Sequence, residues 1–546
     1  MAGVVLENLS WKKLIALSVI LLLLLITFFL VGGLQAPQPN NVNIIIGTKC
    51  YDKGRYFNRE RWFIPRGRNA CDHLESLDPT DQRIISEGIT DKQIVFSFWI
   101  PGPREGQELK MHPQFQYMLS VLQIDIEYQL ENPVGPNPIM LLDFRLGYRD
   151  EEDREDDWKL LAESAEDRKL VCSIDINPNK TESGSLYECE LLHAFEISSV
   201  HHHYYLLNLR LPPSREKNIN IGQITDISLV TIHQNGGFTY VWFSVKTAVF
   251  PCVLMVLIWF WRRIRQMCRP PNLLERTLFA LGITLTILNV PIEWLTFWLN
   301  IPFMLLLNDI RQGAFYAMLL SFWIIFTGEH IMDQTERNRL KLYWKHLAAV
   351  VFGCFCLFVF EMCERGMQLK NPFFSMWSSE TGSKLALAFI ILAAIAATCY
   401  FLFLCVMIFR VFRNISAKRS SLPSMSVMRK KYYMGLIFRF KFLMLLTLFC
   451  AALTVAAFII SQLSEGRWKW GDENLKLEYS SAFFTGVYGL WNVYIFGLLS
   501  LYAPSHKTAS DTSLVTDSQE EEVQLTNQMF SDATNLTSFA SKAAQD

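Results

Sequence analysis

The chain has 546 residues, of which 51% are hydrophobic and only 19% are charged, against roughly 25% charged in an average soluble domain. Its 51 basic and 52 acidic residues give a formal net charge of −1, so no basic excess is present and nucleic acid is excluded as the default partner. Aromatic residues make up 13% of the chain and Gly and Pro follow no period, which excludes collagen, coiled coil and wholesale disorder.

The hydrophobic excess is concentrated in eight apolar runs, each long enough to span a bilayer, which takes about 20 residues. They cover residues 14–34, 241–261, 278–299, 312–332, 347–363, 385–409, 436–462 and 482–503. The first run follows Lys12 and Lys13, and its alternative interpretation is a cleaved signal peptide. It is longer than the usual apolar core of about 7–15 residues, and no good cleavage site follows it, so we expect a retained anchor.

The distribution of Lys and Arg between the short loops predicts the orientation of these spans. One set of alternate loops carries 16 such residues and the other set carries 6, the sets being 262–276, 333–345 and 410–431 against 300–309, 365–384 and 464–480. The first set is therefore expected in the cytosol. This places both termini there, with 1–13 as a short leading segment and 504–546 as a disordered tail, and it puts 35–240 in the lumen or outside the cell.

Residues 35–240 carry the pattern of an antiparallel β-sandwich. Apolar and polar residues alternate strictly in 122–130, and apolar residues recur at every second position in 140–148 and 205–211. Such alternation buries one face of a strand and exposes the other face to solvent. A late strand is predicted at 223–234, and Asn235-Gly236-Gly237 is expected to form a turn before the second span. The sequence thus predicts a multi-pass α-helical membrane protein of eight transmembrane helices, seven of them in 241–503, with an inserted lumenal all-β domain.

Four cysteines lie in the predicted lumenal segment, where an oxidising environment favours disulfides. They are Cys50, Cys71, Cys172 and Cys189. Four cysteines allow three pairings, and closeness in sequence favours Cys50 with Cys71 and Cys172 with Cys189. Asn179 begins the one sequon of this segment and is the expected glycosylation site.

Two clusters in the same segment contain residue types that bind metal ions. The acidic run 150–157 lacks the alternating ligands and the glycine of a calcium-binding loop, so a solvated loop is expected. The consecutive residues His201, His202 and His203 cannot converge on one ion if they lie on a strand, because neighbouring side chains point to opposite faces. We therefore expect neither a metal ion nor a cofactor here.

Four ionisable residues lie in or beside different predicted spans, at the end nearest the lumen: Glu293, Asp309, Arg311 and Glu361. Charged groups inside a membrane are costly and often functional. Pro291 is expected to kink the helix that carries Glu293 and to free backbone polar groups. One interpretation is a polar mouth above a cavity that opens to the lumen. The other is a set of interfacial residues that reach the headgroups, and the sequence leaves both open.

The fourth predicted span carries two further patterns. A stripe of small residues, Gly313, Ala317 and Ser321, is typical of close helix packing. Three aromatic residues lie elsewhere around the same helix: Tyr316, Phe322 and Trp323. They are candidates for lining a pocket, and the alternative is contact with lipid or with neighbouring helices.

Several long strings of this sequence closely resemble the Wntless family. They are IHQNGGFTYVWF from Ile232, RPPNLLE from Arg269, NVPIEW from Asn289, DIRQGAFYAMLLSFWIIFTGEHIMDQ from Asp309, MCERGMQL from Met362, GLIFRFKFLML from Gly435 and YAPSHK from Tyr502. The strings occur in this order and extend from the end of the lumenal segment through the last span. The first half of the lumenal segment and the tail match more loosely.

The resemblance implies a cargo receptor that escorts lipid-modified Wnt proteins from the endoplasmic reticulum through the Golgi to the plasma membrane and then recycles through early endosomes and transport vesicles. It implies a receptor-like bundle for the later helices, Wnt contacts within about 101–232, and entry of the cargo's palmitoleoyl chain into the bundle. Nine residues of the spans are then the candidates for the acyl cavity: Glu293, Asp309, Arg311, Gly313, Tyr316, Ala317, Phe322, Trp323 and Glu361. The implied partners are Wnt proteins, a clathrin adaptor and retromer-type recycling machinery.

Two sorting signals are also implied by the resemblance. Tyr433-Met434-Gly435-Leu436 fits the pattern Tyr-x-x-Φ, where the family carries an endocytic signal; a tyrosine of the membrane interface is the alternative. The ending that contains Lys542 resembles the family's retrieval signal for the endoplasmic reticulum, but Ala543 and Asp546 stand where glutamates are usual.

Two other functions compete with this interpretation. A membrane-embedded hydrolase or acyltransferase is the minor one, because the sequence carries no P-loop, no Gly-x-Ser-x-Gly elbow and no repeated Cys-x-x-Cys. A G-protein-coupled type of signalling receptor is the other, but neither Asp-Arg-Tyr nor Asn-Pro-x-x-Tyr occurs at the end of a span. We predict that the protein is a cargo receptor and not an enzyme.

Overall fold

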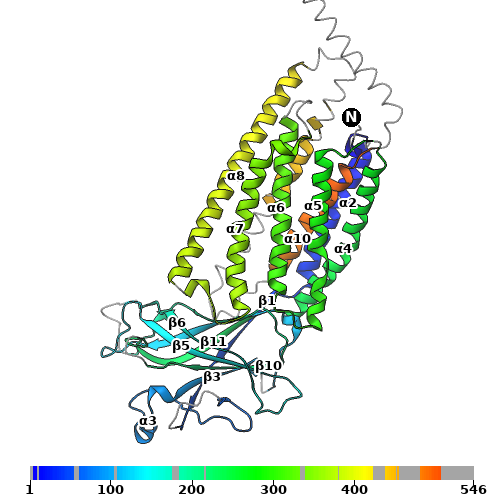
Figure 1. The fold of residues 1–546 in the computed structure, drawn as a ribbon. Helices are drawn as coiled ribbons and strands as arrows, with labels where there is room; N and C mark the ends of the chain where they lie inside the picture. The colour runs from blue at the N-terminus through cyan, green and yellow to red at the C-terminus, as the bar shows by residue number, and fades with distance from the viewer. Residues whose placement is uncertain are drawn as a thin grey trace, which may run out of the picture.

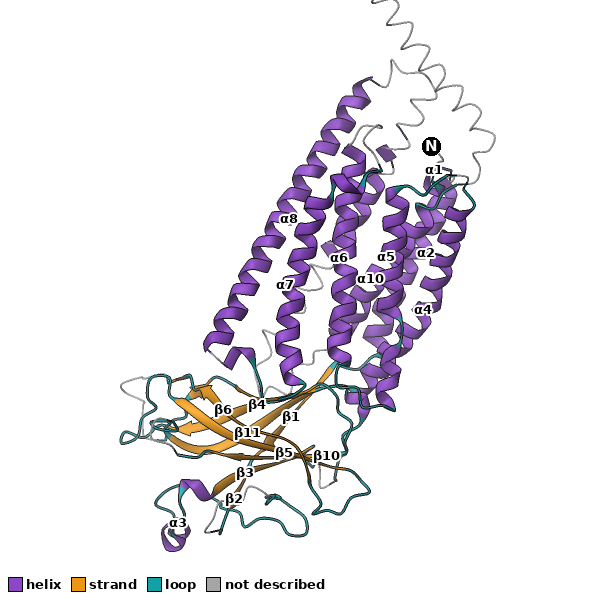
Figure 2. Ribbon diagram, in the orientation of Figure 1, coloured by secondary structure: helices purple, strands orange, loops and turns teal. Residues whose placement is uncertain are grey.

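A bundle of long helices stands on a β-sandwich (Figure 1), and Figure 2 shows that the strands are confined to one end of the molecule. The computed structural model describes residues 4–8, 11–54, 61–103, 107–174, 184–213, 217–267, 269–331, 338–378, 380–421, 434, 437–438, 440–450, 452–453 and 480–505. The first described residues lie at the end of the bundle away from the sandwich (Figure 1).

Seven helical segments among the described residues are long and apolar enough to cross a membrane. They are built from α2 (Trp11–Leu30) with the short η1 (Val31–Gln35), α4 (Gly236–Arg265), α5 (Leu273–Asn289) with η4 (Ile292–Phe297), α6 (Met304–Ile331), α7 (Trp344–Gln368), α8 (Glu380–Ser421) and α10 (Ser480–Leu501). A shorter apolar helix, Phe440–Cys450, lies inside the remaining predicted span, 436–462. Residues 454–479 lie outside the described residues.

Helix α8 is much longer than its apolar run, which ends at residue 409. The sequence prediction stopped there because Arg410 and Arg413 follow. The helix nevertheless continues to Ser421, since Arg and Lys are good helix formers and polarity alone does not end a helix.

The predicted break at Pro291 is confirmed. Helix α5 ends at Asn289, and the chain continues as the 3₁₀ turn η4. Two backbone carbonyls at the break, those of Val290 and Ile287, accept hydrogen bonds from the Arg311 guanidinium at 3.0 Å and 3.5 Å. A side chain of α6 thus replaces the helical hydrogen bonds that proline removes.

The sandwich consists of two antiparallel sheets and a short extra pair. One sheet has the order β1-β11-β4-β9 and the other β2-β3-β10-β5-β6. The strands are β1 (Asn40–Ile46), β2 (Thr48–Tyr51), β3 (Ile94–Ile100), β4 (Met118–Glu127), β5 (Ile139–Arg149), β6 (Lys159–Lys169), β7 (Cys172–Ser173), β8 (Glu188–Cys189), β9 (Leu192–Ile197), β10 (Tyr204–Arg210) and β11 (Gln223–Gln234). Burial alternates residue by residue along β4, which confirms the period-two prediction for that strand. The prediction is wrong for β10, which is buried on both faces, because Trp99 and Trp158 pack against Tyr204 and Leu206 on its second face.

The predicted turn at Asn235-Gly236-Gly237 is wrong. Helix α4 begins directly at Gly236, and the Asn235 side chain caps it by accepting a hydrogen bond from the Gly237 backbone N–H at 2.9 Å. Asn is a preferred residue at both turns and helix N-termini, so its presence alone did not distinguish the two.

The two disulfides join Cys50 to Cys71 and Cys172 to Cys189, the pairs that closeness in sequence favours. The second joins β7 to β8, which form a two-stranded sheet among the described residues. Asn179 lies between these two strands but outside the described residues. The acidic run 150–157 forms the loop between β5 and β6, as predicted, and there Asp150 contacts His202 at 3.0 Å.

The loop between α7 and α8 is anchored inside the sandwich. Phe373 is fully buried there and its ring stacks on Phe144 with centroids 5.0 Å apart. The Phe373 carbonyl accepts a hydrogen bond from the Arg168 guanidinium at 2.6 Å, and the carbonyl of the preceding Pro372 accepts one from the Glu196 backbone N–H at 2.8 Å. The bundle and the sandwich therefore share a hydrophobic core at this point.

We expect Phe373→Ala to destabilise the sandwich by about 3–5 kcal/mol, because it leaves a cavity in a closed core. Thermal unfolding of the purified full-length protein, followed by protease sensitivity of the sandwich, measures the loss. Trp377→Ala is the matched control, since Trp377 is an aromatic residue of the same loop with 52% of its surface exposed. Equal protease sensitivity of the two variants would contradict this anchoring role.

Candidate functional site

A large cavity, here called the main cavity, lies between α4, α5, α6 and α10 near the sandwich end of the bundle. Its volume is about 530 Å³, inside the range of roughly 300–1,000 Å³ typical of ligand sites. Mostly aromatic and aliphatic side chains line it: Trp242, Lys246, Leu285, Leu288, Asn308, Gln312, Phe315, Tyr316, Phe483, Phe484, Val487, Tyr488, Trp491 and Asn492. Such a wall suits a long apolar ligand with few polar atoms.

A smaller cavity of about 150 Å³, here called the junction cavity, lies where the sandwich meets the bundle. The sandwich side contributes Gln116 and Ser198, and the bundle side contributes Glu293 and Thr296. Gln116 donates a hydrogen bond to the Thr296 hydroxyl at 3.0 Å, which ties the two sides together. Three residues line both cavities, so the two spaces are neighbours: Trp242, Asn308 and Phe484.

Three charged side chains form a buried ion cluster beside these cavities. One carboxylate oxygen of Glu293 accepts hydrogen bonds from the Lys246 ammonium at 2.6 Å and from the Arg311 guanidinium at 2.5 Å. The exposed fractions are 2% for Glu293, 6% for Lys246 and 5% for Arg311. The second carboxylate oxygen of Glu293 has no hydrogen-bond partner among the described residues. A buried charge is tolerated only when it is paired in this way.

The four predicted residues of the polar mouth do not form one group. Glu293 and Arg311 belong to the buried ion cluster, whereas Asp309 and Glu361 approach Arg365 at 4.0 Å each. Arg365 also pairs with Glu196 of the sandwich, so this second group fastens α7 to the sandwich. Of the two interpretations that the sequence leaves open, a single polar mouth made by all four residues is therefore wrong. The residues separate into two groups because Asp309 and Arg311 are two residues apart on one helix, so their side chains point to different sides of it.

Sequence reasoning missed Lys246, the third member of the buried ion cluster. A signal was present, because Lys246 is a cation within the predicted span 241–261. It was overlooked because it lies near the start of a run, where a lysine ordinarily extends to the headgroups. The structure instead holds it against Glu293, with its ammonium 5.5 Å from the centroid of the Trp242 ring.

A polar network supports one wall of the main cavity. The Tyr488 hydroxyl donates to the Asn289 side chain at 2.5 Å, and Asn289 donates to the Asn492 side chain at 2.6 Å. Asn492 in turn donates to the Tyr488 backbone carbonyl at 2.9 Å. Because these amides satisfy one another, the wall is held in one arrangement, which favours a preformed cavity.

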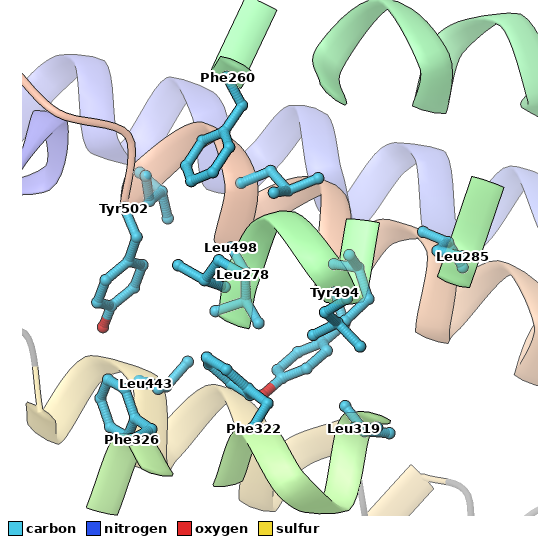
Figure 3. Close-up of a cluster of buried hydrophobic side chains, with 14 of the residues drawn as sticks. Phe260, Leu278, Leu285, Leu319, Phe322, Phe326, Leu443, Tyr494, Leu498 and Tyr502 are labelled. Carbon is cyan, nitrogen blue, oxygen red and sulfur yellow. The ribbon is translucent and has the colours of Figure 1, made fainter. Parts of the chain in front are cut away.

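Of the candidates on α6, Tyr316 lines the main cavity, and the others do not. Phe322 is fully buried in the core of the bundle, where Figure 3 shows it near Leu319 and Tyr494. Trp323 donates a hydrogen bond to the Tyr494 hydroxyl at 3.1 Å. Gly313 is exposed and nothing lies within 4 Å of the place where its Cβ would be, so the predicted close packing is wrong there. Ala317 is half-buried.

Among the described residues, one charged side chain lines the main cavity. Its wall combines one lysine with amides, tyrosines and apolar groups, and it holds no histidine, cysteine or carboxylate. Among the described residues no group of three His, Cys, Asp or Glu side chains is arranged to hold a metal ion. The predicted sorting residues Tyr433, Leu436 and Lys542 lie outside the described residues.

Comparison with known proteins assigns both parts of the chain. Residues 48–234 match a family model described as Wntless, GOLD domain, and residues 235–506 match one described as Wntless-like, transmembrane domain. The two matches meet where β11 ends and α4 begins.

Relatives of this chain are similar over nearly their whole length. The chain is 49% identical to Protein wntless homolog B of Xenopus laevis over 100% of both chains. It is 50% identical to the Protein wntless homolog of Homo sapiens over 96% of both chains, and 46% identical to the Protein wntless of Drosophila grimshawi over 100% of both.

Proposed function

The chain belongs to the Wntless family, and we propose that it is a sorting receptor that binds palmitoleoylated Wnt proteins and escorts them to the cell surface for secretion. Membership of the family supports a role in Wnt secretion and an embedding in the membrane. The observation that carries the lipid-binding part is the main cavity, an apolar space of about 530 Å³ inside the bundle.

The energetics explain why such a receptor needs a cavity. Burying an acyl chain contributes about 0.8 kcal/mol per CH₂ group, so a chain with roughly a dozen buried carbons contributes on the order of 10 kcal/mol. A secreted protein that carries this chain cannot leave the membrane for water at that cost. A receptor that offers an apolar cavity can hold the chain throughout transport.

The protein part of the cargo needs a second surface, and the sandwich is suited to provide it. We place Wnt contacts within about 101–232, as the family resemblance implies. This range contributes Gln116 and Ser198 to the junction cavity, directly beside the main cavity. A polypeptide bound to the sandwich would therefore stand within reach of the space that takes its acyl chain.

Co-purification tests this function. Receptor and palmitoleoylated Wnt are co-expressed and isolated together, in parallel with a Wnt whose acylated serine is replaced by alanine. We expect strong capture of the acylated cargo and weak residual capture of the other through the sandwich. Equal capture of the two cargos would contradict binding of the lipid.

We further propose that the sandwich faces the lumen and that both termini face the cytosol. If so, Asn179 carries an N-linked glycan, whereas Asn414 and Asn535 remain bare. Glycosidase treatment is then expected to shift the mobility of the wild-type protein and to leave Asn179→Gln unchanged. A shift that survives Asn179→Gln and disappears with Asn414→Gln or Asn535→Gln would invert this topology.

The proposed route runs from the endoplasmic reticulum and the Golgi to the plasma membrane, with return through early endosomes and transport vesicles. Tyr433 and Leu436 would present the endocytic signal to a clathrin adaptor, and retromer-type machinery would return the receptor. Lys542 would take part in retrieval to the endoplasmic reticulum. The support for this route is the family resemblance alone.

A further inference from the structure

The wall of the main cavity contains a single charged residue, and that residue is a lysine. The other lining residues, all within the described part of the chain, are apolar, aromatic or uncharged polar groups. Lys246 is buried to all but 6% of its surface, so its ammonium is withdrawn from solvent. A positive charge at one place in an otherwise apolar cavity favours a ligand with one anionic group and a long apolar tail.

The ammonium of Lys246 has more N–H donors than it uses among the described residues. It carries three N–H groups, and among the described residues one hydrogen bond is formed, to Glu293 at 2.6 Å. The same carboxylate oxygen also accepts from Arg311. Two cations therefore share one carboxylate, which leaves a formal surplus of one positive charge in a site of low dielectric constant. A surplus of this kind is stabilised by an anion placed against it.

No carboxylate of the described residues lines the main cavity. Glu293 lines the junction cavity and not the main one. Asp309 and Glu361 approach Arg365 in the second group of charges, and neither lines the main cavity. The ammonium of Lys246 is thus the charged group that a ligand of the main cavity would meet.

We propose that, in the absence of cargo, the main cavity binds a lipid with one anionic head group and one extended acyl chain. The head group receives hydrogen bonds from Lys246, and the chain lies against Leu288, Phe315 and Trp491. The inference rests on the proposed function in one respect, namely that the same cavity accepts the acyl chain of the cargo. Because the two ligands occupy one space, the anionic lipid competes with cargo and its concentration sets how readily cargo is captured.

The charge of the ligand separates this lipid from the cargo. The cargo's chain is attached through an ester, which is neutral and accepts an ordinary hydrogen bond. A carboxylate or a phosphate forms a charge-assisted hydrogen bond with an ammonium, which is about twice as strong. The carboxylate of a free fatty acid and the phosphate of a lysophospholipid share this chemistry, and the experiment distinguishes the two.

The test uses three ligands with the same chain on purified full-length receptor in neutral phosphatidylcholine nanodiscs. They are palmitoleic acid, its methyl ester and 1-palmitoleoyl lysophosphatidic acid, each titrated against radiolabelled palmitoleic acid at a pH where the acid is ionised. We expect the wild type to bind the acid roughly 10- to 100-fold more tightly than the ester. Lys246→Met should abolish this preference, and Lys246→Arg should restore it.

The Lys246→Met variant is expected to fold, and a matched control variant is available for it. Lys246→Met leaves Glu293 paired one to one with Arg311, so the buried cluster stays balanced and the receptor is expected to fold. Gln312→Met is the matched control, because it removes an uncharged polar group from the same wall and should change acid and ester binding by the same factor. Binding of the lysophosphatidic acid with the same dependence on Lys246 would name the phosphate as a second source of the head group.

A wild-type receptor that binds acid and ester equally, or a preference for the acid that survives Lys246→Met, would overturn the proposal. Because these titrations contain no cargo, their failure is distinct from failure of the proposed function. Leu288→Trp separates the two directly: if it abolishes binding of palmitoleic acid but leaves capture of acylated Wnt intact, the anionic-lipid site stands and the cargo's chain lies elsewhere.

Discussion

Leu288→Trp is expected to reduce capture of palmitoleoylated Wnt by more than 100-fold while leaving residual capture of unacylated Wnt unchanged. Leu288 lines the main cavity, and an indole in its place would fill part of the space for the acyl chain. Displacing about four CH₂ groups at roughly 0.8 kcal/mol each amounts to about 3 kcal/mol, which is more than a 100-fold change in affinity. Co-precipitation with the two cargos, normalised to folded receptor, measures the effect.

Ile287→Trp is the matched control for this experiment. Ile287 precedes Leu288 on the same helix, but 48% of its surface is exposed and it does not line the main cavity. The same increase in volume there should leave capture of both cargos at the wild-type level. If Leu288→Trp lowered both cargos equally, the bundle would only hold the sandwich in place and the acyl chain would bind elsewhere.

The buried ion cluster is expected to be more sensitive to loss of its carboxylate than to loss of either cation. Glu293→Ala leaves the ammonium of Lys246 and the guanidinium of Arg311 together without an anion, at positions 6% and 5% exposed. Leaving a buried charge unpaired costs about 3–5 kcal/mol. We therefore expect little folded receptor for this variant, measured as the monodisperse fraction after purification and as the thermal unfolding midpoint.

Arg311→Ala is expected to be milder, because Lys246 still pairs with Glu293 at 2.6 Å. Its cost should come mainly from the carbonyl of Ile287, which loses its donor at the break in the helix, whereas the Val290 carbonyl keeps the hydrogen bond from the Ile292 N–H at 2.8 Å. The expected order of folded yield is thus wild type, Arg311→Ala, Glu293→Ala. An Arg311→Ala receptor less stable than Glu293→Ala would show that the guanidinium acts chiefly on the backbone and that the charge balance is secondary.

The strands of the sandwich could be predicted closely because alternation of burial is a local property of a strand. The predicted strand 223–234 coincides with β11, and the three alternating stretches fall on β4, β5 and β10. The end of α5 was predictable for a similar reason, since proline acts on its own helix. The start of α4 was not, because Asn235 and its glycines suit a cap as well as a turn.

The candidate site was predicted less well, because membership of a cavity depends on how helices rotate against one another. On α6, Tyr316 faces the main cavity, whereas Phe322 faces the core, and both are aromatic residues of one apolar run. The last helix contributes six lining residues, among them Trp491 and Asn492, yet its sequence alone gave no reason to single them out. Lys246 was missed both because it lies near the start of its apolar run and because its partner Glu293 comes from another helix, 47 residues away in the chain.

The measurement that tests the central claim most directly is the location of the acyl chain in the receptor. Wnt carrying a palmitoleoyl analogue with a diazirine near its end is bound to wild-type receptor, irradiated and analysed by peptide mass spectrometry. We predict cross-links to residues of the main cavity, chiefly Phe315, Tyr316 and Trp491. Cross-links confined to the sandwich, or to exposed residues of α7 and α8 such as Phe355 and Ile391, would contradict the account.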